Sequence, residues 1–177
     1  MQLTNTEQRW GLVARLLHWA TFLVILGAWY AVEMHSDFPK GSDERAQWMM
    51  LHKALGLSVF FLVWLRLGAR IGQTTPAATG TALQQKLAKG IHLGLYALMI
   101  GMPLGGLLAM QLFGAPVSWF GLFEIPVFLA ENKELGKNII ELHEAAWSVL
   151  FVLVIAHMGA AGYHQFVKKD GTLRRML

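Results

Sequence analysis

Hydrophobic residues fall into four long blocks along the chain, separated by stretches that hold most of the charged residues. Each block is close to the roughly 20 apolar residues that a helix needs to cross a bilayer. Glycines inside the blocks, such as Gly56, Gly101 and Gly159, suit helices that approach closely in lipid. The pattern predicts an all-α integral membrane protein with four transmembrane helices, Leu16–Val32, Met49–Leu67, Ile91–Phe113 and Ala145–Phe166.

Composition supports a lipid environment and excludes several kinds of site. The 177 residues are 55% hydrophobic and only 15% charged, and this length predicts one domain covering 1–177. Because there is no cysteine, disulfides, iron–sulfur clusters and covalently attached c-type haem are excluded. The net charge of +4 comes from residues at the ends of the blocks, so we expect no nucleic-acid partner. No cleavable signal peptide is expected.

The charges of the connecting segments predict the orientation of the helices. The N-terminus, residues 66–90 and the C-terminus hold ten of the 15 Lys and Arg residues and only two of the 11 acidic ones. The opposite connections hold the other five basic residues and nine acids. By the positive-inside rule, we expect both termini to lie in the cytoplasm.

The connection from Gly114 to Glu144 is too long to be a simple turn. It carries aromatic residues, including Trp119 and Phe123, that are apolar enough to lie on the membrane surface. Pro116 and Pro126 divide it into short pieces. We therefore expect a short interfacial helix in this long outer loop.

Four histidines stand where helices of this topology would bring them together. His143 and His157 are fourteen residues apart, nearly four helical turns, so both leave almost the same face about 21 Å apart along the axis. His18 and His52 begin two other blocks on opposite sides of the membrane. Matching the four histidines by their depth in the membrane predicts an inner pair, His18 with His157, and an outer pair, His52 with His143.

Two-histidine sites at two depths favour haem iron. A closed zinc site needs four ligands at one point, whereas a haem needs only two axial ligands from the protein. The alternative for any single histidine is an interfacial hydrogen bond. However, burying ionisable groups in a span is costly unless they are paired. We therefore predict two haem b groups with these four histidines as the axial ligands.

Other polar residues near the block ends are candidate contacts for haem propionates or a quinone. They are Arg15, Lys53, Arg66, His92 and His164. We favour such roles over iron ligation for His92, which opens the third helix, and for His164 at the cytoplasmic rim. For Arg15 and Arg66, the alternative role is positive-inside anchoring. Lys53 lies on the outer side, against the charge bias, where it would attract a small anion unless the acids of the preceding connection oppose it. His35 follows the first helix and is expected to face solvent.

Six short segments, spread over essentially the whole chain, match the motifs of a known family. They are Leu17-His18-Trp19, Phe38-Pro39, His52-Lys53-x-x-Gly56, Trp119-Phe120-Gly121, His143-Glu144 and Lys169-Asp170-x-Thr172-Leu173. Together with His157 they resemble the bacterial cytochrome b561 family. This resemblance implies a four-helix protein of the bacterial inner membrane, with two haem b groups, that exchanges electrons with ubiquinone. The family usually has two adjacent histidines near the tail, where this chain has His164-Gln165.

The segment from Phe38 to Ser42 resembles the superoxide oxidase branch of that family. The first hypothesis is therefore an oxidoreductase that takes electrons from superoxide or a similar small periplasmic donor and reduces ubiquinone. The second is a haem-bearing membrane anchor that relays electrons for a partner dehydrogenase or hydrogenase. A third, without redox chemistry, is a histidine-based carrier of protons or metal ions.

Overall fold

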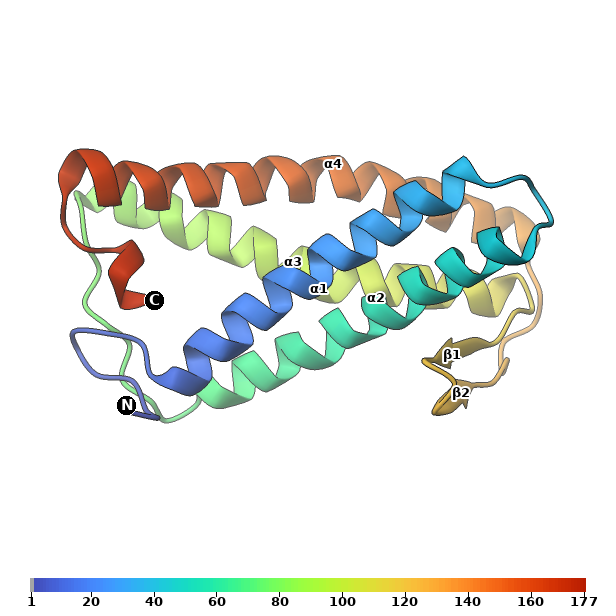
Figure 1. Ribbon diagram of the computed structural model, residues 1–177, viewed down its shortest axis with the longest axis horizontal. Coiled ribbons are helices and arrows are strands. Elements are labelled where there is room, and N and C mark those ends of the chain that lie inside the picture. Colours follow the sequence, from blue (N-terminus) through green and yellow to red (C-terminus); the bar gives the residue numbers. More distant parts are fainter. Residues whose placement is uncertain (1) are drawn as a thin grey trace.

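The computed structural model describes residues 2–177. Four long helices run antiparallel to form a bundle (Figure 1): α1 (Leu12–Asp37), α2 (Asp43–Arg70), α3 (Ala82–Leu112) and α4 (Lys133–Tyr163). Each is long and apolar enough to cross a membrane. The predicted architecture of four transmembrane helices is confirmed.

The helices extend beyond the apolar blocks because polar residues cap them further out. Ser42 accepts a hydrogen bond at the start of α2, and Asn132 does so at the start of α4. Thr81 and Gln84 form a reciprocal capping box before α3. Because α1 continues to Asp37, His35 lies in its last turn and is partly buried. The expectation that His35 follows the helix is wrong.

The bundle consists of two helical hairpins, α1–α2 and α3–α4, which pack against each other along α2 and α3. Their shared core contains Val59, Val63 and Met99. Large apolar side chains elsewhere on the helices are exposed, among them Phe151 and Met158 on α4. Such residues suit contact with lipid chains, which are as apolar as the side chains themselves.

Both chain termini lie at the same end of the bundle, called here the terminal end (Figure 1). The Trp10 amide donates to the Arg175 carbonyl over 3.3 Å. The Arg175 side chain in turn donates to the Ala77 carbonyl over 2.7 Å. The N-terminal segment, the α2–α3 connection and the C-terminal tail are therefore held together there.

The opposite end, called here the hairpin end, carries a two-stranded antiparallel ribbon, β1 (Val117–Trp119) and β2 (Phe123–Ile125). The expected interfacial helix is wrong, since this ribbon stands in its place. Phe120 and Gly121, between the strands, have φ values of 52° and 73°. Positive φ at both central positions is what a type I′ hairpin turn requires and what a helix does not allow.

Two polar side chains attach this loop to the helices. The indole N–H of Trp119 donates to the Ser58 hydroxyl on α2 over 3.0 Å. Gln111, near the end of α3, is 1% exposed. Its amide donates to the Pro126 carbonyl and accepts from the Phe128 N–H, each over 2.9 Å. The loop is thus fixed against the outside of the helices that hold the site.

Candidate functional site

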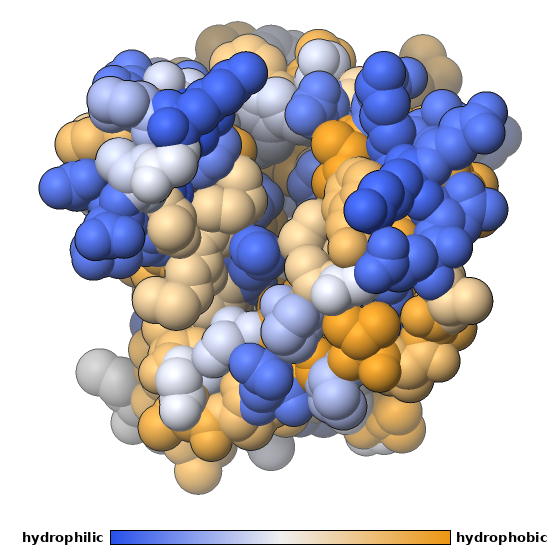
Figure 2. Space-filling view, turned by 90° about the vertical axis from the view of Figure 1, so that its right-hand side faces the viewer, coloured by the Kyte–Doolittle hydropathy of each residue, from blue (hydrophilic) through white to orange (hydrophobic). Residues whose placement is uncertain are grey.

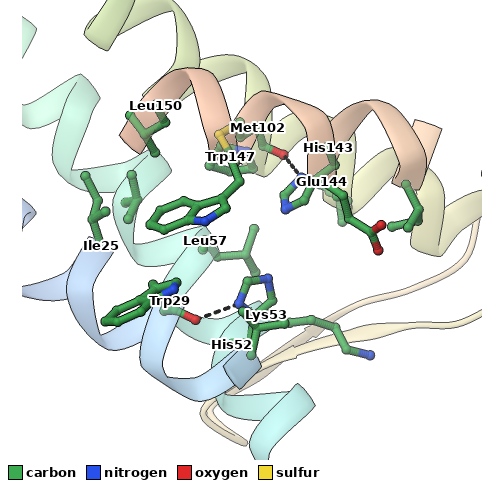
Figure 3. Close-up of a pocket in the computed structure, with 18 of the residues that line it drawn as sticks. Ile25, Trp29, His52, Lys53, Leu57, Met102, His143, Glu144, Trp147 and Leu150 are labelled. Atoms are coloured by element: carbon green, nitrogen blue, oxygen red, sulfur yellow. Dashed lines mark hydrogen bonds between the residues drawn. The ribbon is translucent and has the colours of Figure 1, made fainter. Parts of the chain in front are cut away.

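The predicted histidine pair at the hairpin end is present, and its rings face each other (Figure 3). The ring centroids of His52 on α2 and His143 on α4 are 6.2 Å apart. His52 Nδ1 lies 2.8 Å from the Ala28 carbonyl, and His143 Nδ1 lies 3.0 Å from the Met102 carbonyl. Because a carbonyl only accepts, each Nδ1 donates and each neutral ring keeps an unprotonated Nε2. These are the nitrogens that a metal can bind.

The spacing of this pair fits two imidazoles on opposite sides of one metal ion. A metal–imidazole bond of about 2.0 Å, plus about 1.1 Å from nitrogen to ring centre, puts the two centroids about 6 Å apart. The observed 6.2 Å agrees with that value. A ligating histidine usually donates its other nitrogen to a carbonyl or carboxylate, as both rings do here. The donor set therefore fits a haem iron.

The pair lines a cavity of about 420 Å³ that is bordered by all four helices. Its walls are largely apolar, and Gly106 of α3 supplies space beside the His143 ring. A Cβ at Gly106 would lie 3.4 Å from His143 Cε1. Glu33, Lys53 and Glu144 are the charged residues of the lining. Figure 2 shows this end of the molecule, where hydrophilic residues gather in two groups on either side of a recess.

A pair of stacked tryptophans lines the same cavity. Trp29 of α1 and Trp147 of α4 have centroids 6.1 Å apart and ring planes within 12° of each other. The sequence pattern did not pair these residues. The available signal was that Trp147 lies one helical turn from His143, on nearly the same face.

The second predicted pair, toward the terminal end, is also brought together. The centroids of His18 on α1 and His157 on α4 are 6.0 Å apart. His92 of α3 lies 5.2 Å from the His157 ring. Because α3 begins at Ala82, His92 stands well inside the helix. The expectation that His92 opens the third helix is wrong.

Arg66 gives the second pair a different environment. Its Nη2 donates to His18 Nδ1 over 3.2 Å, and its guanidinium lies 5.4 Å from the centre of the Tyr96 ring. Since His18 accepts at Nδ1, its neutral ring carries the proton on Nε2. Binding a metal through that Nε2 requires the Arg66 contact to be released. The spacing of this pair fits a haem iron, while its proton arrangement differs from that of the first pair.

The remaining candidates lie around the two pairs. Arg15 near the start of α1 has a buried Nε with no hydrogen-bond partner among the described residues. His164 Nδ1 lies 2.5 Å from the Asp170 carboxylate in the tail. Burial raises the pKa of Asp170. Hydrogen bonds from Thr172 and His164 outweigh that effect and lower the pKa to about 2. His164 is thus part of the contacts that hold the C-terminal tail.

Comparisons with known proteins find one matching family and several relatives. A family model described as prokaryotic cytochrome b561 matches residues 9–177. The chain is 32% identical to cytochrome b561 homolog 1 of Escherichia coli, covering 91% of this chain and 92% of the relative. It is 30% identical to cytochrome b561 homolog 2 of the same organism, covering 100% and 95%. It is 26% identical to the probable superoxide oxidase CybB of Yersinia pestis, covering 91% of each.

Proposed function

Because this chain belongs to the prokaryotic cytochrome b561 family of haem b membrane electron-transfer proteins, we propose that it carries two haems and passes electrons from a small periplasmic donor to ubiquinone. The observation that carries this proposal is the pair of facing histidine couples. Their centroid separations of 6.2 and 6.0 Å both suit two ligands on one iron.

In this proposal, His52 and His143 hold one haem, and His18 and His157 hold the other. Haem supplies one-electron chemistry, and the protein orients it and adjusts how readily it is reduced. The carbonyls of Ala28 and Met102 orient the first two rings. Arg66 must turn away from His18 Nδ1 when His18 binds iron, because that nitrogen then carries the proton.

The two sites lie at different depths of the membrane. His143 and His157 are separated by about 21 Å of rise along α4, a large part of the roughly 30 Å hydrocarbon core. Two haems at these levels would connect its two surfaces. Since ten of the 15 basic residues belong to the terminal end, we place that end in the cytoplasm and the hairpin end in the periplasm of a bacterial inner membrane.

At the hairpin end, Lys53 supports a small anionic donor. Lys53 lines the cavity beside His52 and forms no ion pair within residues 2–177. An unpaired cation in the wall of a cavity attracts anions, and the two acids of the same lining, Glu33 and Glu144, are exposed to solvent that screens them. The name of the Yersinia relative, a probable superoxide oxidase, makes superoxide the donor to test first.

At the terminal end, polar side chains are available for a quinone that enters from the bilayer. Arg15 has an unpartnered Nε, and His92 stands beside His157. A quinone carbonyl accepts hydrogen bonds, and both side chains can donate them. We assign His164 to the tail instead, because Asp170 already occupies its Nδ1.

Haem content tests the two sites separately. Purified protein should contain two haems per chain, measured by pyridine haemochrome and protein quantification. His143→Ala and His157→Ala should each remove one haem. His35→Ala, a histidine outside both pairs, should remove none and serves as the control. Retention of both haems by either pair variant would refute the assigned ligands.

Quinone reduction tests the direction of transfer. Under a steady superoxide flux, the purified protein should reduce a soluble ubiquinone analogue. Lys53→Gln should lower the rate at low ionic strength and have less effect at high salt, because salt screens the attraction. A protein that holds two haems but reduces no quinone would contradict this donor and acceptor. It would favour the relay role beside a partner enzyme, detectable by co-purification from native membranes.

A further inference from the structure

The two histidine pairs stand in different electrostatic surroundings. At the hairpin end, His52 and His143 each donate a proton to a backbone carbonyl. Toward the terminal end, His18 instead contacts the guanidinium of Arg66 over 3.2 Å. A histidine that donates to a carbonyl becomes a stronger electron donor to its metal, whereas a neighbouring cation opposes positive charge on the metal.

The position of Arg66 follows from its spacing along α2. It comes fourteen residues after His52, the same spacing that separates His143 from His157 on α4. Where α4 carries its second histidine, α2 therefore carries a cation at a similar depth. The guanidinium lies over the Tyr96 ring at 5.4 Å, a favourable cation–π contact that leaves its charge intact.

No negative side chain of residues 2–177 forms an ion pair with Arg66. The next cation along α2 is Arg70, one turn further on, and it lies 5.5 Å from the Trp10 ring. Asp170, an acid of the terminal end, accepts hydrogen bonds from His164 and Thr172 instead. Among residues 2–177, the charge of Arg66 beside the terminal-end pair is therefore not balanced by an ion pair.

The charges around the hairpin-end pair are mixed. Glu33 and Glu144 line its cavity together with Lys53. Both acids are exposed to solvent, which screens them. The main difference between the two pairs is therefore the partly buried Arg66, whose field acts where the local dielectric is low.

Reducing a haem adds one electron and removes one unit of positive charge, so a fixed cation favours the reduced form. Building on the proposed function, we infer that Arg66 makes the terminal-end haem the easier of the two to reduce. An electron that leaves the hairpin-end haem, oxidising it from iron(II) to iron(III), then reduces the other from iron(III) to iron(II) in a downhill step. Arg66 acts as a positioning residue that sets the direction of transfer toward the terminal end.

The order of the two potentials is measured by spectroelectrochemical titration of the purified holoprotein, followed by haem absorption. His143→Ala leaves the terminal-end haem, and His157→Ala leaves the hairpin-end haem. The haem left in His143→Ala should titrate at the higher potential. The opposite order, or equal potentials, would overturn the inference. A protein without two haems by pyridine haemochrome would instead refute the proposed function.

The role of Arg66 itself is tested in the two-haem protein. Arg66→Met should lower the higher-potential wave and leave the other wave unchanged, while Arg66→Lys, which keeps the charge, should stay near the wild type. Arg174→Met removes an exposed cation of the same end and should move neither wave. An Arg66→Met protein with both haems and unshifted waves would overturn the inference. If Arg66→Met loses a haem, the shift is read from Arg66→Gln instead, and the order of the two potentials in the histidine variants still decides.

Discussion

Replacing Gly106 with valine should weaken binding of the hairpin-end haem although neither of its histidine ligands is substituted. Gly106 lies on α3 beside the His143 ring, in the wall of the cavity. An added Cβ would lie 3.4 Å from His143 Cε1 and 3.6 Å from Nδ1, which is ordinary contact. Alanine should therefore be tolerated at this position, and the extra methyl groups of valine should not.

The energetic cost of valine follows from the distance between an added Cβ and the His143 ring. A γ-methyl extends about 1.5 Å beyond Cβ, so a methyl that points at the ring would approach it to roughly 2 Å, well below the optimum of about 3.5–4.0 Å. Valine in a helix has one dominant rotamer and cannot easily turn away. Overpacking of this kind costs about 1–3 kcal/mol. If the strain falls on the His143 ring, haem binding should weaken about 5- to 140-fold.

The measurement is the rate at which haem transfers to a scavenging apoprotein. It is made in a His157→Ala background, so that only the hairpin-end haem is present. Gly101→Val is the matched control, because a Cβ at Gly101 meets nothing within 4 Å. If Gly106→Val releases haem no faster than Gly101→Val, the His143 ring does not bind iron in the position described.

Two further predictions concern the ends of the bundle. The lowered pKa of Asp170 means that its interactions with His164 and Thr172 stabilise the tail fully above pH about 4, and that this stability is lost as the pH falls toward 2. Asp170→Asn should cost about 1 kcal/mol at neutral pH, after allowing for solvent screening, and remove this acid dependence in denaturation of the detergent-solubilised protein. Trp119→Phe removes the bond to Ser58 and should destabilise the loop by about 0.5–1.5 kcal/mol. Faster amide exchange confined to that loop would show this, and unchanged exchange would contradict it.

The sequence predicted the facing pairs because helical geometry and charge topology act over long distances. The fourteen-residue spacing of His143 and His157 fixed one face of α4. The charge asymmetry of the connections fixed which ends of the other helices lie beside it. These two constraints were enough to choose His18 and His52 as partners. Such reasoning needs only regular helices and no detail of side-chain contacts.

The details that the sequence did not predict depend on local structure. The place of His92 was wrong because Thr81 and Gln84 start α3 a full ten residues before it. This Thr-x-x-Gln signal was present in the sequence. The β ribbon requires a positive φ at Phe120, and the sequence does not indicate this because phenylalanine rarely adopts positive φ. The bond from Arg66 to His18 depends on a side-chain rotamer, which apolar patterning does not specify.

Each histidine couple joins the two halves of the bundle, since one member comes from the α1–α2 hairpin and the other from α4. Elsewhere the two hairpins meet along α2 and α3 and through the stacked Trp29 and Trp147 rings. In the proposed two-haem protein, haem binding therefore holds the two halves of the bundle together. A cell short of haem would then accumulate inserted but incompletely assembled chains. The amount of mature protein would follow the supply of cofactor as well as the rate of synthesis.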